Sequence, residues 1–274
     1  MPEVERALDA RGVAHRTIET EALAHAIHEA REAAGRGEIP VVMSGDGLVG
    51  QIGGVLAEGD VPMGIIPGGR GNDLARVLGI PTETEGAVDV LAAGNVRRID
   101  VGEVNGHRFL GIASCGFDSD ANRIANEAEL IQGNLVYLYA GLRALAAWKP
   151  AHFVVIVDGE RHALTGYTIA AANNKAYGGG MFLAPDALLD DGKLDVVITG
   201  QIGKLRFLFN LPKVFKGTHV DEEGVTVLRG AEVRIEADRE FAVFADGDHL
   251  TDTPATVRVL DQALGVIAPA SAPA

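Results

Sequence analysis

The chain has 274 residues, enough to bury a core and to form one large or two medium domains. Its 47% hydrophobic and 23% charged residues are typical of a soluble globular protein, and no apolar run is long enough to span a membrane. A formal net charge of −14 argues against nucleic acid binding through a basic surface. The single cysteine, Cys115, excludes an internal disulfide and fits the reducing cytoplasm, where we expect the protein to be located.

Helical and strand patterns alternate over the first eighty residues. Residues 4–10 have the pattern of a helix end, residues 13–18 that of a strand, and residues 22–34 that of an amphipathic helix. Short apolar runs at 41–43 and 63–66 predict two more strands, each followed by a helical pattern, at 48–57 and 74–78. This alternation indicates an α/β domain with a doubly wound parallel sheet.

Each of the strands at 41–43 and 63–66 runs into a glycine-rich turn that holds acidic residues. The candidate site residues of these turns are Ser44, Gly45, Asp46 and Gly47 in the first and Gly68, Gly69, Arg70, Asn72 and Asp73 in the second. Backbone N–H groups at a helix start can bind phosphate, and glycine allows close approach of the main chain and a positive φ. Carboxylates beside phosphate require Mg²⁺ or a hydroxyl proton as a partner. The turns therefore suggest phosphoryl transfer, although tight turns between strands and helices explain the glycines equally well.

Neither turn has the spacing of a Walker phosphate-binding loop or of the dinucleotide motif G-x-G-x-x-G. Glycine loops by themselves are therefore weak evidence for a particular nucleotide.

From Val96 onward, strand patterns predominate over the alternation of strands and helices. A helix predicted at 87–93 ends at Gly94-Asn95, and strand patterns begin at Val96, with a hairpin signal at Asn105-Gly106. We place the domain boundary there, with an α/β domain at 1–97 and a mainly antiparallel β domain at 98–274. A long apolar helix is predicted at 130–148, and further strands at 153–157, 163–172, 194–198, 225–228, 232–236, 241–244 and 256–260.

The stretch 41–76 resembles the diacylglycerol kinase and sphingosine kinase family of lipid kinases, in particular its bacterial members. The family's GGDGT-like turn is matched by residues 45–47, and its G-I-I-P-x-G-T-x-N-D segment by residues 64–67 and 72–73. The likeness continues through 173–185 and covers nearly the whole chain. It implies an N-terminal domain of the NAD kinase and phosphofructokinase type, a C-terminal β-sandwich, and ATP and Mg²⁺ as cofactors.

The resemblance also implies roles for individual residues. Asp246 would be the base that takes the proton of a lipid hydroxyl, and Asp248 stands where the family has glutamate. The two glycine turns would bind ATP, while Asp46, Asp73 and Asp100 would order Mg²⁺ and its waters. For Asp100, a solvated strand end is an equally good explanation.

A second, structural Mg²⁺ is implied near residues 186–193. Asp191 would bind it through its carboxylate, together with backbone carbonyls near Leu188 and Lys193, a donor set that suits a hard cation. A plain turn before the strand at 194–198 is the alternative.

The chain also departs from the family pattern. Leu48 and Gln51 replace polar residues near the expected nucleotide, and Arg70 replaces a threonine. Family members begin with a strand that ends in an Asn-Pro-x-x-Gly-like turn, whereas this chain begins inside the helix that should follow that strand. Because a parallel sheet without an inner strand leaves backbone groups unpaired, we expect either a truncated gene model or loss of part of the nucleotide site.

Residues 202–220 contain four basic residues and three phenylalanines but no acid. In so acidic a chain, this local reversal suggests contact with an anionic membrane surface, where a lipid substrate would be found. An ordinary pair of helices whose lysines extend into water is the competing explanation.

The leading hypothesis is an ATP-dependent lipid kinase that phosphorylates a hydroxyl of diacylglycerol or a related lipid, giving phosphatidic acid or its analogue. Such a protein would be cytoplasmic and peripherally membrane-associated, and either a monomer or a homodimer. The alternatives are a non-catalytic nucleotide- or lipid-binding member of the same family and an enzyme similar to NAD kinases, which share the Gly-Gly-Asp-Gly turn.

Overall fold

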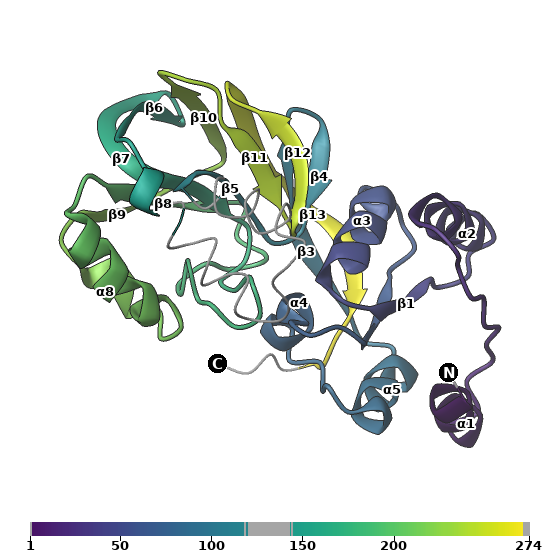
Figure 1. The fold of residues 1–274 in the computed structure, drawn as a ribbon. Helices are drawn as coiled ribbons and strands as arrows, with labels where there is room; N and C mark the ends of the chain where they lie inside the picture. The colour runs from purple at the N-terminus through teal and green to yellow at the C-terminus, as the bar shows by residue number, and fades with distance from the viewer. Residues whose placement is uncertain (1, 118, 120–142, 144, 271–274) are drawn as a thin grey trace.

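The computed structural model describes residues 2–117, 119, 143 and 145–270. The N-terminal part holds two strands and five helices in these positions: α1 Pro2–Ala10, α2 Leu23–Gly35, β1 Val41–Ser44, α3 Asp46–Leu56, β2 Gly64–Pro67, α4 Asp73–Val77 and α5 Thr84–Ala93. Strand β1 pairs with β2 in parallel, with Val41 opposite Gly64, and α3 connects the two strands. The predicted parallel α/β region is therefore confirmed (Figure 1).

One N-terminal prediction is wrong, because residues 13–18 form neither a strand nor a helix. A strand requires a neighbour with which to pair, and the only partner of β1 in the described chain is β2. The side chains of Val41 and Met43 on β1 remain 45% and 42% exposed.

The C-terminal part is a single antiparallel sheet that curls on itself. Its elements are β3 Val96–Val104, β4 His107–Phe109, β5 Ile112–Gly116, β6 Ala151–Val157, β7 Glu160–Ala172, β8 Leu194–Gly200, α8 Lys204–Val214, η1 Thr218–Asp221, β9 Val225–Gly230, β10 Glu232–Ala237, β11 Ala242–Ala245, β12 Asp248–Asp252 and β13 Ala255–Ile267. Strand β7 pairs with β6 through its first half and with both β5 and β8 through its second half, so this long strand joins three neighbouring strands. The predicted antiparallel β domain and the hairpin at Asn105-Gly106 are confirmed.

The N-terminal and C-terminal parts are joined by strand pairing and by a common hydrophobic core. The end of β13 pairs with the start of β3, and Val266 of β13 forms a parallel bridge with Met63, just before β2. Both residues are fully buried in the N-terminal hydrophobic cluster. A boundary at residue 97 therefore stays a prediction, since the last strand belongs to both halves.

Helix α3 lies against the β domain along a face made of glycines, beside β4 and β13 (Figure 1). A Cβ atom on Gly54 would lie 3.1 Å from the side chain of Arg108 in β4. The Arg108 guanidinium in turn donates to the carbonyls of Gly54 and Ala57 at the end of α3, at 3.1 and 3.2 Å. A cation at a helix C-terminus is favourable, and this one fixes the helix to the sheet.

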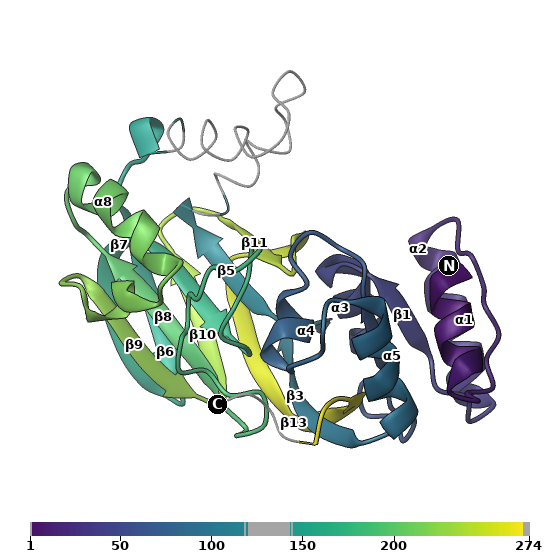
Figure 2. The same cartoon turned by 90° about the horizontal axis from the view of Figure 1, so that it is seen from below.

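Among the helices that the structure describes, none is long and apolar enough to cross a membrane. The helix predicted at 130–148 falls largely outside the described residues. The predicted membrane segment at 202–220 forms α8 and η1, at the opposite end of the molecule from α1 and α2 (Figures 1 and 2).

Candidate functional site

The two glycine turns pack directly against each other. A Cβ atom on Gly69 would overlap Cα of Gly45, and one on Gly45 would lie 3.1 Å from Cα of Gly69. None of the glycines predicted to need a positive φ in these turns has one, so that expectation is wrong. Close approach is the reason for glycine here, and the group approached is the neighbouring turn.

Asn72 and Asp46 hold the second turn in place. Asn72 has a φ of 54°, and its side-chain amide bonds both the N–H and the carbonyl of Gly69, at 2.8 and 2.9 Å. Asp46 accepts a hydrogen bond from the N–H of Leu74 at the start of α4 (3.2 Å). Each turn therefore positions the other. In the described part of the chain the exposed Arg70 makes no hydrogen bond or ion pair, so its guanidinium is available to a ligand.

A third glycine turn, at residues 178–180, was not predicted as part of the site. All three of its glycines have positive φ, and the N–H of Gly179 donates to Asp73 Oδ2 at 2.8 Å. Burial raises the pKa of Asp73, opposed by this hydrogen bond and reinforced by the charge of Asp46. A run of three consecutive glycines was the sequence signal that could have identified this turn.

The carboxylates of Asp46 and Asp73 lie on either side of Gly71. A Cβ atom on Gly71 would lie 2.8 Å from Asp46 Oδ2 and 3.4 Å from Asp73 Oδ2. Asp73 Oδ1 is buried and, in the described chain, has no hydrogen-bond partner. The guanidinium of Arg76 lies 4.0 Å from this oxygen. Two neighbouring carboxylates, one with an oxygen that accepts no hydrogen bond, suit a divalent cation.

Asp246 lies where the α/β part meets the β domain. Its carboxylate accepts hydrogen bonds from the N–H groups of Leu110 and Gly111, at 2.8 and 2.9 Å. Glycine is required around it: a Cβ atom on Gly50 of α3 would lie 2.7 Å from Asp246 Oδ2, and one on Gly111 would overlap Oδ1. Burial raises the pKa of Asp246 to about 6, partly offset by the two N–H donors, and the charge of Asp46 adds to the increase.

Two departures from the family pattern have a structural explanation. The Gln51 side chain donates to Asp248 Oδ2 at 3.0 Å, linking α3 to β12. Leu48 packs against the N-terminal hydrophobic cluster. The two side chains therefore contribute to the interface and to the core, respectively.

Asp100 is fully buried, and its carboxylate joins the loop before β8 to strand β13. It accepts hydrogen bonds from the N–H groups of Gly192 and Gln262, both at 2.7 Å, and burial raises its pKa despite them. The Asn173 side chain links the carbonyls of Asp100 and Leu110, at 2.9 and 3.1 Å, and so connects this region to the backbone that holds Asp246. The Asp100 carboxylate accepts its hydrogen bonds from these two backbone N–H groups, and a role in ordering Mg²⁺ stays a prediction.

The predicted structural metal site holds an arginine. The carboxylate of Asp191 pairs with the guanidinium of Arg229 in β9 and accepts the N–H of Lys193 at 3.1 Å. Arg229 also lies 3.3 Å from the carboxylate of the buried Asp195. The described residues contain no group of three His, Cys, Asp or Glu side chains placed to hold a metal ion. This arrangement fits a guanidinium group, so Mg²⁺ at Asp191 and the Leu188 and Lys193 carbonyls stays a prediction that requires Arg229 to move.

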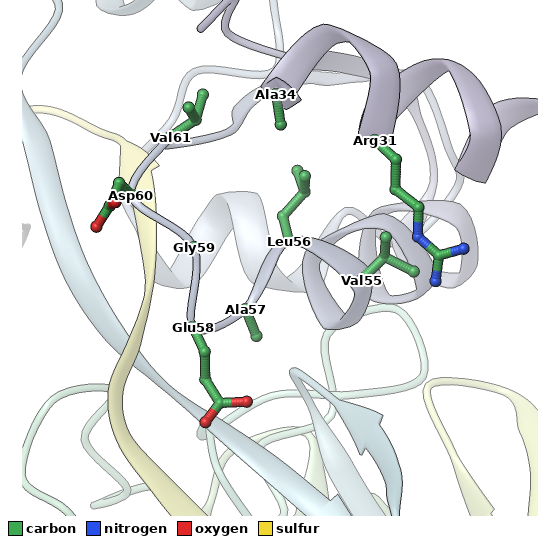
Figure 3. A pocket seen from close by; sticks show the side chains of 9 residues that line it. All are labelled: Arg31, Ala34, Val55, Leu56, Ala57, Glu58, Gly59, Asp60 and Val61. Atoms are coloured by element: carbon green, nitrogen blue, oxygen red, sulfur yellow. The ribbon is translucent and has the colours of Figure 1, made fainter. Parts of the chain in front are cut away.

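A cavity of about 400 Å³ lies elsewhere, between α2 and the loop that follows α3 (Figure 3). Its lining is largely apolar and includes Leu56 and Val61, with Arg31 at the rim. It contains none of the predicted site residues. The cavity is therefore separate from the candidate site, and nucleotide binding over the glycine turns stays a prediction.

Comparisons with known proteins agree with this arrangement. Residues 1–104 match the diacylglycerol kinase catalytic domain, and residues 111–268, more than half of the chain, match the YegS C-terminal NAD kinase beta sandwich-like domain. A diacylglycerol kinase of Mycobacterium tuberculosis is 36% identical over 236 residues, covering 84% of this chain and 76% of that protein. One of Bacillus subtilis is 28% identical over 229 residues, covering 82% and 76%.

The fold comparison extends further. The crystal structure of a diacylglycerol kinase from Bacillus anthracis superposes with a TM-score of 0.77 at 22% identity, covering 97% of this chain and 89% of the other. That likeness concerns the fold, while the matches to the domain families and to the Mycobacterium protein concern the sequence itself. On these grounds the chain belongs to the family of diacylglycerol kinases and YegS-like lipid kinases.

Proposed function

We propose that this protein transfers the γ-phosphoryl group of ATP to a hydroxyl of diacylglycerol or a related lipid, giving phosphatidic acid or its analogue. The observation that carries the proposal is the position of Asp246, between the glycine turn that contains Asp46 and the backbone of the β domain. Membership of a kinase family implies the use of ATP. The lipid acceptor is suggested by the names of the relatives.

The chemistry requires a proton acceptor and a site for phosphate. A carboxylate with a pKa of about 6 is mostly ionised at neutral pH and still basic enough to accept a proton. As the lipid oxygen forms its bond to the γ-phosphorus, its proton passes to Asp246, and the bond between that phosphorus and the ADP oxygen breaks. Arg70 and the N–H groups of the glycine turns would bind the phosphates, and Asp46 and Asp73 would hold the Mg²⁺ that neutralises their charge.

The test compares the wild type with Asp246→Asn on a panel of lipid acceptors that includes diacylglycerol, monoacylglycerol and ceramide. Asparagine keeps the shape of the side chain but cannot accept the proton, so kcat should fall by roughly 10²–10⁴-fold with little change in ATP affinity. Asp252→Asn, an exposed acid in β12, serves as the matched control and should keep full activity. If the wild type binds ATP but phosphorylates no acceptor, the non-catalytic alternative is correct.

A further inference from the structure

Helix α8 presents apolar side chains on the face opposite to the one that it buries. Phe207 and Asn210 face the protein and are buried. On the other side, Leu205 and Phe209 are 73% and 74% exposed. Positions 205, 209 and 212 follow one another at helical spacing, and Pro212 is exposed as well. A surface helix normally shows the reverse pattern, with polar residues outward.

The apolar surface continues beyond the helix. Phe215, which follows α8, is 56% exposed. Phe182, in the loop between β7 and β8, is 37% exposed. The N–H of Phe182 donates to the carbonyl of Val214 at 2.9 Å, which places the loop beside the end of the helix. The chain has nine phenylalanines, and the three exposed ones all lie here. We call Phe182, Leu205, Phe209, Pro212 and Phe215 the α8 patch.

Basic side chains surround the α8 patch. Arg206 and Lys213 form exposed ion pairs with Glu223 and Glu222, at 2.7 and 2.5 Å. Such pairs contribute little in water, so a phosphate group can compete for the same cations. In the part of the chain that the structure describes, the ammonium group of Lys216 contacts no acceptor. An apolar stripe with cations along its edges is complementary to an anionic bilayer, whose acyl chains lie beneath phosphate groups.

The α8 patch is also connected to the candidate site. The loop that carries Phe182 begins with the glycine turn at 178–180, whose Gly179 donates to Asp73. A bilayer in contact with the α8 patch would therefore lie next to the loop that helps build the phosphate site. A lipid acceptor has to reach this region from a membrane.

We propose that the α8 patch inserts into the boundary between headgroups and acyl chains of an anionic bilayer, with Leu205 and Phe209 as the main inserting residues. The proposal rests on the proposed function for its choice of a lipid surface. Transfer of each of these apolar side chains from water into the acyl region is favourable. Removing two partly inserted side chains should therefore weaken binding about 10- to 100-fold.

The first experiment measures co-sedimentation of the full chain with vesicles of phosphatidylcholine and phosphatidylglycerol, without ATP. The double variant Leu205→Ser/Phe209→Ser should bind about 10- to 100-fold more weakly than the wild type. Leu23→Ser, an equally apolar change at the exposed α2 on the far end of the molecule, should bind like the wild type. Equal binding by the double variant and the wild type, or no vesicle binding by the wild type, would overturn the proposal.

The second experiment identifies which side chain enters the bilayer. The tryptophan added by Phe209→Trp should be quenched by lipids brominated on their acyl chains, beyond any quenching of the native Trp148 in the wild type, whereas that added by Leu23→Trp should not. If the serine double variant loses self-association instead, with vesicle binding unchanged, the α8 patch contacts a second copy and the proposal is wrong. Phosphorylation of a soluble short-chain diacylglycerol should be unchanged in the double variant, and its absence in the wild type would refute the proposed function while leaving the insertion result intact.

Discussion

Asp246 combines a constrained position with an unusual pKa. Its two backbone N–H donors stabilise the carboxylate, yet burial outweighs them and raises the pKa to about 6. At neutral pH the folded protein therefore holds an ionised group that would be more stable in water. Such a cost is characteristic of residues whose charge state serves a reaction.

The pH dependence of stability follows from this pKa. Because the pKa of Asp246 in the folded protein lies above its ordinary value of 3.8, its contribution to stability is complete below that value and is lost as the pH rises through about 6. Between about pH 4 and pH 7, the melting temperature of the wild type should fall relative to that of Asp246→Asn, which carries no charge. Asp60→Asn, an exposed acid that makes no hydrogen bond or ion pair in the described part of the chain, should show the same pH dependence as the wild type.

Activity should respond in the opposite direction. In the proposed mechanism the ionised carboxylate of Asp246 is the base, so kcat should rise with pH and level off above the pKa of about 6. For stability, a constant difference between the melting temperatures of the wild type and Asp246→Asn from pH 4 to pH 7 would show that this carboxyl group does not titrate in that range.

At the scale of elements, the site is built by three glycine turns that touch. The first two pack at Gly45 and Gly69, and the second and third meet where Gly71 lies 3.4 Å, measured from its ideal Cβ position, from Cα of Gly179. Each turn takes part of its geometry from another element. The strands β1 and β2 position two of the turns, while the third reaches across from the β domain.

Gly69→Ala tests this packing. Because the new Cβ would overlap the backbone of Gly45, the turns should separate, which should lower the free energy of unfolding by about 1–3 kcal/mol and weaken ATP binding. Gly35→Ala at the end of α2 is the matched control, since no atom lies within 4 Å of its new Cβ and its φ is not positive. Urea unfolding and ATP titration of both variants provide the measurement. Equal stability of the two variants would show that the turns do not need close contact.

At the scale of the whole molecule, buried carboxylates join distant parts of the chain. Asp100 of β3 holds the N–H groups of Gly192 and Gln262, which lie 92 and 162 residues away in sequence. Arg229 ties β9 to the loop at Asp191 and to the buried Asp195, whose pKa is raised by burial and lowered by Arg229. Asp195 is buried, so removing Arg229 would be costly because the charge of Asp195 would remain without compensation.

Magnesium at Asp191 can be tested through this ion pair. If Mg²⁺ binds there, it must displace Arg229, so Arg229→Gln should show a larger Mg²⁺-dependent increase in melting temperature than the wild type. Asp191→Ala should show no such increase, and chelation should leave its melting temperature unchanged. A response to Mg²⁺ that is identical in Arg229→Gln and Asp191→Ala would place the ion elsewhere.

The sequence by itself determined most of the local elements and the family to which the chain belongs. Apolar periodicity located the strands at 41–43 and 63–66 and the helices that follow, because these patterns are local properties of the chain. The resemblance identified the family and brought the turn at Asp246 into the candidate site. The strand expected at 13–18 does not form, because a local pattern does not determine whether a segment reaches the edge of another strand and pairs with it.

Only the tertiary structure decided which residues from separate helices, strands and turns contact one another. Hydrogen bonds from Gly179 to Asp73 and from Gln51 to Asp248 join residues that are 106 and 197 positions apart. Composition and spacing cannot encode such contacts, because they arise when separate elements bury their surfaces together. The pKa of Asp246 and the ion pair between Arg229 and Asp191 have the same origin: both depend on which atoms the folded chain brings within a few ångströms.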